Sequence, residues 1–210
     1  MDEFENSYEG ETRDLVQRYE ELIKNNASFF LEVEEFENII EYYLSRNHID
    51  KALEVTDTAL DQHPFVVNFM TRKAELLLFD QAFEEALELL EKAQTLEPSN
   101  HDIYLLIASV YEDMEDFSAA IESYDTALNL QSGNTDEIYL LKAFTYEGWD
   151  RFDDAIDCLK LALQNNPNNK QALYELAYRY DQQNEPEKSI EFYQQFIDED
   201  PFAYQAWYNL

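Results

Sequence analysis

Few side chains in this sequence could act as a catalytic base, a nucleophile or a metal ligand. The histidines are His48, His63 and His101, and none is followed three or four residues later by a second histidine or a carboxylate. The one cysteine, Cys158, lies beside Leu159 in an apolar pattern, where a buried structural thiol is expected. There is no glycine-rich phosphate loop and no H-E-x-x-H motif. We therefore expect no enzyme, no catalytic residue, no metal site and no cofactor.

Carboxylates are the abundant charged groups. The chain has 46 acidic and 14 basic residues, which gives a formal net charge of −32. Such a charge repels nucleic-acid phosphates and anionic lipid and attracts cationic partners, so we expect neither nucleic-acid nor membrane binding. Solubility alone would also explain the acidic excess.

Three features predict a cytoplasmic protein. The first residues of the chain are acidic and lack the apolar run of a signal peptide. No apolar stretch approaches the length of about 20 residues that a membrane-spanning helix needs. A single cysteine allows no disulfide within the chain, which is typical of a reducing compartment.

The elements that position these side chains repeat along the chain. Small residues recur at steps of 34 or 35 positions, and a second small position and a proline recur in phase with them. The first set is Ala52, Ala86, Ala120, Ala155 and Ser189; the second is Ala59, Ala93, Ala127 and Ala162, with Phe196 in the last place; the prolines are Pro64, Pro98, Pro167 and Pro201. The sequence therefore predicts an array of similar units.

Each unit contains two amphipathic helices. In the first half, Tyr104, Ile107, Ala108 and Tyr111 show the i, i+3, i+4, i+7 spacing of one helix face. Small residues at Ala74, Ala108, Ala143 and Ala177 would let the second helix approach, and Ile40 takes this place in the first unit.

This pattern resembles the tetratricopeptide repeat, W-x-x-L-G-x-x-Y followed by a small residue, an aromatic residue, a second alanine and a proline. The resemblance covers nearly the whole chain after residue 32, with repeats at 33–66, 67–100, 101–135, 136–169 and 170–203. It implies an all-α fold, a right-handed α-solenoid of stacked antiparallel helix pairs. Two departures recur: the family tryptophan is replaced by Phe36, Met70, Tyr104, Tyr139 and Leu173, and the usual turn glycine by Asn47, Gln81, Glu115, Asp150 and Asn184.

The ends fall outside the repeats. We expect residues 1–11 to be a disordered acidic segment and residues 12–32 to form a capping helix and linker that cover the first repeat. Residues 204–210 read as a truncated sixth repeat or a capping helix, with Trp207 and Leu210 at the W-x-x-L positions. Trp207 is a candidate for self-association.

The resemblance also implies that the first helix of each repeat lines a concave groove. Its expected partner-binding residues are Glu37, Glu41, Glu75, Phe79, Leu105, Ser109, Glu112, Leu140, Phe144, Tyr174 and Tyr178. Some family members clamp the acidic tail of a chaperone with Lys, Arg and Asn, but Glu37 and Glu41 stand where that clamp begins, so we reject such a partner. Ordinary core packing is the alternative for the apolar members, above all for Leu105 and Leu140.

The expected function is a protein-interaction scaffold whose acidic groove binds a basic peptide or helix with apolar anchors. Two alternatives stay open. The chain could be a structural module that forms a homodimer through its C-terminal end, or a regulatory piece of a larger protein.

Overall fold

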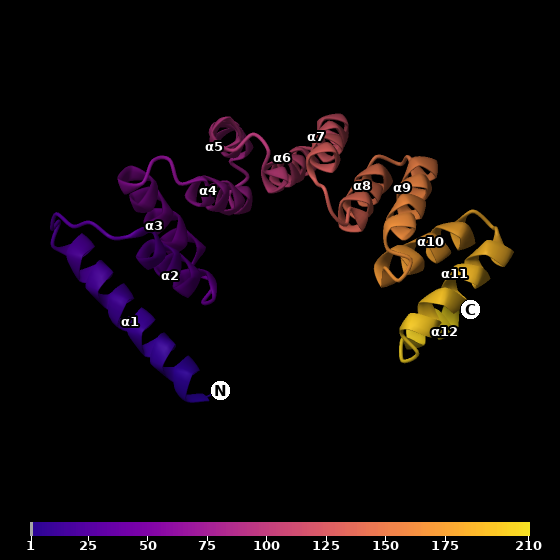
Figure 1. The fold of residues 1–210 in the computed structure, drawn as a ribbon, viewed down its shortest axis with the longest axis horizontal. Helices are drawn as coiled ribbons and strands as arrows, with labels where there is room; N and C mark the ends of the chain where they lie inside the picture. The colour runs from indigo at the N-terminus through magenta and orange to yellow at the C-terminus, as the bar shows by residue number, and fades with distance from the viewer. Residues whose placement is uncertain (1) are drawn as a thin grey trace. The chain divides into compact units, whose positions relative to one another are not determined.

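The computed structural model describes residues 2–210, with side chains from Gly10 onward, and over these residues it contains helices and no strand (Figure 1). The helices are α1 (Asp2–Lys24), α2 (Val33–Leu44), α3 (Ile49–Gln62), α4 (Val67–Phe79), α5 (Phe83–Leu96), α6 (His101–Asp113), α7 (Phe117–Leu130), α8 (Asp136–Gly148), α9 (Phe152–Asn165), α10 (Lys170–Gln182), α11 (Pro186–Glu199) and α12 (Tyr204–Asn209). None of these helices combines the length and the apolar composition needed to cross a bilayer.

The chain divides into two compact units, Met1–Pro98 and Ser99–Leu210, called unit 1 and unit 2 below. Unit 1 contains α1 and the helix pairs α2/α3 and α4/α5, and unit 2 contains α6/α7, α8/α9 and α10/α11 followed by α12. The first helix of each pair begins at the first residue of one of the five expected repeat ranges. The predicted all-α architecture of stacked helix pairs is confirmed.

The recurring small residues let the helices of each unit pack closely. Most are alanines with no exposed surface: Ala52, Ala59, Ala74, Ala86, Ala93, Ala108, Ala120, Ala127, Ala143, Ala155, Ala162 and Ala177. Ser189 and Ile40 are almost as fully buried. A methyl side chain at these positions fills the contact without separating the two backbones, which is why the spacing of the alanines marks the helix pairs.

A left-handed residue turns the chain within each pair. Asn47, Gln81, Glu115, Asp150 and Asn184 have φ between 56° and 59°. The residue after each of them donates its N–H to a carbonyl five positions earlier, as His48 does to Tyr43 at 2.9 Å. This is the Schellman ending of a helix, which usually needs glycine. Asn and Asp tolerate it, whereas Gln81 and Glu115 carry a steric cost.

Helix α1 begins earlier than the sequence predicts. We expected disorder up to residue 11, but the helix starts at Asp2, and Met1 lies outside the described residues. The segment contains no proline, and acidic residue types are favoured near the start of a helix, so its sequence is compatible with a helix that continues into the rest of α1.

The second half of α1 covers the first repeat. Val16 and Tyr19 are buried in the same cluster as Phe36 and Ile39 of α2. The Tyr19 hydroxyl donates to Thr58 Oγ1 at 3.2 Å. These contacts place α1 against α2 and α3 within unit 1, where the sequence predicts a capping helix.

Candidate partner-binding surfaces

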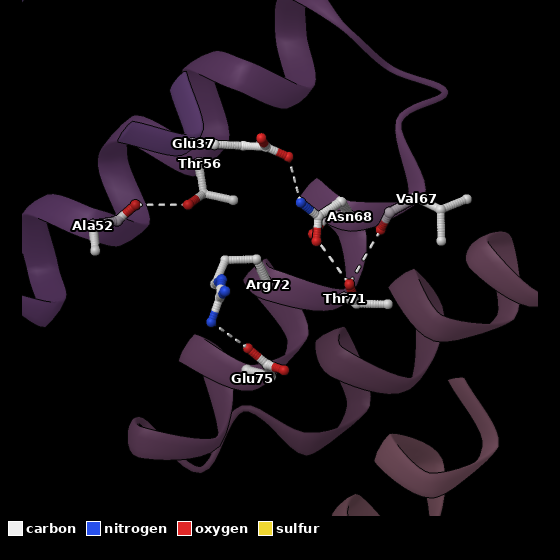
Figure 2. A network of polar contacts seen from close by, with 8 residues as sticks. All are labelled: Glu37, Ala52, Thr56, Val67, Asn68, Thr71, Arg72 and Glu75. Carbon is white, nitrogen blue, oxygen red and sulfur yellow. Dashed lines mark hydrogen bonds and ion pairs between the residues drawn. The ribbon is translucent and has the colours of Figure 1, made fainter. Parts of the chain in front are cut away.

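In unit 1, the first helices α2 and α4 adjoin along one face. The rings of Phe36 and Phe69 meet edge to face beneath it, with their centroids 6.1 Å apart. Above them, Asn68 Nδ2 donates to Glu37 Oε1 at 2.6 Å, and Figure 2 shows the Glu37 side chain reaching across from α2 to α4. We call this face, formed by Glu37 and Glu41 of α2 and Asn68, Arg72, Glu75 and Phe79 of α4, the α2–α4 surface.

A polar pocket of about 240 Å³ opens on the α2–α4 surface. Glu37, Glu41, Asn68 and Arg72 line it, with Ile40 and Phe69 at its apolar side. The Arg72 guanidinium donates to Glu75 Oε2 at 2.9 Å, one turn along α4 (Figure 2). The pocket therefore holds two carboxylates and one cation, and its formal charge is negative.

The carboxylates of this surface differ in what they already bind. Glu37 accepts from Asn68, and Glu75 accepts from Arg72. Glu41 is exposed, and its carboxylate has no hydrogen bond or ion pair with any residue that the structure describes. One helical turn beyond Glu75, the Phe79 side chain is 70% exposed. Unit 1 thus brings an unpaired acid and an exposed ring onto one face.

Arg72 is not among the residues expected on this face from the sequence. The residue lies four positions after Asn68 and three before Glu75, so helical periodicity places all three side by side. That spacing could have identified Arg72 from the sequence. Its effect is to neutralise Glu75, so that Glu41 rather than Glu75 is the carboxylate left for a partner.

In unit 2, Glu112 is engaged inside the protein. Its carboxylate accepts from the Tyr124 hydroxyl at 3.1 Å and from the Thr145 hydroxyl. Burial raises the pKa of Glu112, and the two hydroxyl groups partly offset that rise. Glu112 was predicted as a groove acid, but here it joins α6, α7 and α8.

The apolar groove residues of unit 2 mostly belong to the core. Leu140 is only 8% exposed and packs with Leu159 and Leu176, so its assignment to the groove is wrong. The reason is that α9 and α10 cover this face of α8. Phe144 is half-buried against the same cluster, and Leu105 is half-buried beside Tyr124. Ser109 is also half-buried.

The two predicted tyrosines of α10 have different environments. Tyr178 is 37% exposed, and the guanidinium of Arg179 lies 5.3 Å from its ring centroid. Arg179 also pairs with Glu147 of α8, a contact that was not expected from the sequence. Tyr174 is half-buried and meets the rings of Tyr193 and Phe196 at 5.8 and 5.5 Å. Of these two tyrosines, Tyr178 is the more exposed.

Tyr174 also lines a second pocket, of about 400 Å³, at the C-terminal end of unit 2. Its walls come from α10, α11, α12 and the loop between the last two, and include Phe196, Phe202 and Tyr204. Trp207 lies nearby on α12, 56% exposed, and its indole N–H donates to the Pro201 carbonyl at 3.1 Å.

Cys158 and His63 are two of the few side chains whose types could take part in catalysis. Cys158 is buried, and burial raises the pKa of its thiol to about 11. His63 Nε2 lies 2.7 Å from the Leu31 carbonyl oxygen, where it fastens the linker after α1 to the end of α3. No group of three or more His, Cys, Asp or Glu side chains among the described residues is arranged to hold a metal ion.

The chain is similar in fold to several solved structures. The crystal structure of MamA superposes with a TM-score of 0.67 at 15% identity, over 84% of this chain and 99% of that one. The crystal structure of YrrB, described as a TPR protein with an unusual peptide-binding site, superposes with a TM-score of 0.59 at 20% identity, over 84% and 91% of the two chains. At these identities the likeness concerns the fold.

Sequence comparison gives one curated relative and a family. The general transcriptional corepressor trfA of Dictyostelium discoideum is 29% identical over 79 residues, which are 38% of this chain and 6% of that protein. A family model described as Tetratricopeptide repeat matches residues 38–101 and 150–204, more than half of the chain, and a second model of the same description matches residues 77–143. This chain therefore belongs to the tetratricopeptide repeat family.

Proposed function

We propose that this chain is a non-enzymatic scaffold for protein–protein interaction, and that its α2–α4 surface binds a basic segment with apolar anchors. The observation that carries the proposal is the Glu41 carboxylate. It is exposed beside a polar pocket and has no partner among the described residues. A lysine or arginine from another protein would supply the charge that this site lacks.

The neighbouring contacts favour a cation at Glu41 in particular. Asn68 and Arg72 already engage Glu37 and Glu75, so a partner cation at Glu41 need not displace either of them. An anionic segment would instead meet Glu37 and Glu41 together, and only Arg72 could offset their charge. The exposed ring of Phe79, on the same helix, offers contact for an apolar side chain of the partner.

The comparisons support a role in binding proteins. YrrB, which has the same fold, is described as having a peptide-binding site, and trfA is named as a corepressor. Peptide binding by this chain is a proposal that rests on the geometry of the α2–α4 surface.

Selection from a displayed library of random peptides tests the proposal without a known partner. The selected peptides should contain Lys or Arg together with large apolar residues, and Glu41→Lys should weaken their binding at least tenfold. Glu88→Lys is the matched control, because Glu88 is an exposed acid on α5 and its substitution changes the net charge by the same amount. Binding that Glu41→Lys leaves unchanged would count against the α2–α4 surface.

Self-association through the C-terminal end is the second candidate function. It is favoured by the exposed aromatic residues Phe202, Tyr204, Trp207 and Tyr208 in unit 2. A net charge of −32 on each copy opposes it. Light scattering at several protein concentrations separates the two functions: a dimer that Trp207→Ala abolishes would establish self-association.

A further inference from the structure

The pocket at the C-terminal end of unit 2 is the larger and the more aromatic of the two pockets described above. Its volume of about 400 Å³ lies within the range of sites that enclose a small ligand or one or two large side chains. Tyr174 and Phe196 form its floor, and Phe202 and Tyr204 stand at its mouth. The floor is therefore apolar, with a tyrosine hydroxyl as its polar group.

The pocket exists where one repeat departs from the others. Phe196 takes the place of the fully buried alanines Ala59, Ala93, Ala127 and Ala162. In those repeats a methyl group allows close packing of helices, whereas the Phe196 ring lies 5.5 Å from Tyr174 and takes part in lining the space beside α12. The pocket thus lies where Phe196 replaces the alanine that the other repeats use for close helix packing.

The mouth of the pocket exposes aromatic surface. Phe202 is 92% exposed and Tyr204 is 79% exposed. Aromatic side chains left in water beside an open apolar pocket are typical of an interaction site, because a partner can bury them and fill the pocket in one event.

The charge around the mouth indicates which partner fits. Helix α11 ends at Glu199 and is followed by its C-cap Asp200, so Asp198, Glu199 and Asp200 lie at the negative end of the helix dipole. Of these three acids, Asp200 lines the pocket. Lys170 also lines the pocket, and its Nζ is 3.9 Å from Asp200 Oδ2, at the limit of an ion pair. A second copy of this chain, with its own charge of −32, would add repulsion, whereas a cation would relieve it.

We propose that this pocket binds a segment of another protein in which an aromatic anchor is flanked by lysine or arginine. The anchor packs against the rings of Tyr174 and Phe196, inside the mouth formed by Phe202 and Tyr204, and the flanking cation lies against the carboxylates at the end of α11. The inference rests on the proposed role in protein binding but concerns a site in unit 2, separate from the α2–α4 surface.

Titration with a capped Gly-Ser-Lys-Trp-Lys-Ser-Gly peptide tests the site. The amide resonances of residues 196–206, Pro201 excepted, should shift on peptide addition, with saturation at millimolar peptide. The same peptide with Glu in place of both Lys, or Ala in place of Trp, should bind at least tenfold more weakly. Shifts confined to α2 and α4 would overturn this inference and still support the function proposed for unit 1.

Substitutions distinguish the contribution of the aromatic contacts to peptide binding from that of the acidic residues. Phe202→Ser and Tyr204→Ser change exposed side chains and should each weaken the peptide at least threefold with unchanged circular dichroism. Glu199→Lys should also weaken it, whereas Glu122→Lys on α7 should not. Equal binding of the Lys and Glu peptides overturns the inference. A dimer in light scattering that Phe202→Ser dissociates also overturns the inference, because the pocket would then be occupied by a second copy of this chain.

Discussion

The Thr145 hydroxyl on α8 donates a hydrogen bond to the Glu112 carboxylate on α6. The Tyr124 hydroxyl on α7 donates to the same carboxylate at 3.1 Å, so one acid joins three helices of unit 2. A position that the family pattern assigns to the groove is thereby used to hold two successive helix pairs together. The carboxylate is half-buried and stays costly to ionise, because burial raises the pKa of Glu112 despite both hydrogen bonds.

Replacement of Glu112 by Gln should therefore change how stability depends on pH. A folded-state pKa above the ordinary 4.5 gives stability that is present below 4.5 and is lost as the pH rises through the folded value. The free energy of unfolding of the wild type, relative to that of Glu112→Gln, should fall between about pH 5 and about pH 7.5. Urea unfolding at both pH values measures this, with Glu122→Gln as a control for the loss of one formal charge. A relative stability that does not change with pH contradicts the assignment.

The ion pair between Lys142 and Asp125 should contribute more to the free energy of unfolding than an exposed ion pair does. The Lys142 side chain is 11% exposed, and it pairs with Asp125 of the preceding helix α7. Asp125→Asn leaves this buried ammonium without its partner and should lower the free energy of unfolding by about 2 kcal/mol. The exposed Lys160–Asp157 pair is the comparison, and Asp157→Asn should cost less than about 0.5 kcal/mol. Equal effects in denaturant unfolding would show that burial does not strengthen the first pair.

Glycine at two of the turns should stabilise the protein. Gln81 and Glu115 have φ of 56° and 59°, a conformation in which a β-carbon crowds the following carbonyl. Gln81→Gly and Glu115→Gly should each raise the free energy of unfolding by about 0.5–1 kcal/mol, after the added flexibility of the unfolded chain is counted. Asn47→Gly is the control, since asparagine already tolerates φ of 58°, and should change stability by less than about 0.3 kcal/mol. A loss of stability at Gln81 would show that its side chain makes a contact worth more than the strain.

These turns also show how far the sequence could predict the fold. The small residues and the turn residues recur in phase because close helix packing and a left-handed turn each admit few residue types. Helix pairing could therefore be predicted from spacing alone. The start of α1 could not be placed in the same way, because its acidic N-terminal residues belong to no repeat and lack an apolar pattern to mark a boundary.

The candidate site could be predicted less well. The family resemblance assigns Leu140 and Tyr178 to the groove side of a first helix, but it does not tell how much a neighbouring helix covers each side chain. Leu140 is 8% exposed, whereas Tyr178 is 37% exposed. The pairing of Arg179 with Glu147 joins residues 32 positions apart, and it depends on how α8 and α10 lie in unit 2. Such contacts follow from the packing of successive repeats, which a pattern within one repeat does not specify.

Salt should stabilise this chain. With 46 acidic and 14 basic residues, repulsion among carboxylates opposes the compact state, and the described ion pairs are mostly exposed. Raising NaCl from about 20 to about 300 mM shortens the screening length and should raise the melting temperature by about 2–4 °C, roughly 1 kcal/mol for a chain of this size. A variant in which Glu88, Glu122 and Glu191, all exposed, are replaced by Gln should melt higher at low salt and gain less from NaCl. A melting temperature that falls with NaCl in circular dichroism would mean that attractive ion pairs outweigh the repulsion.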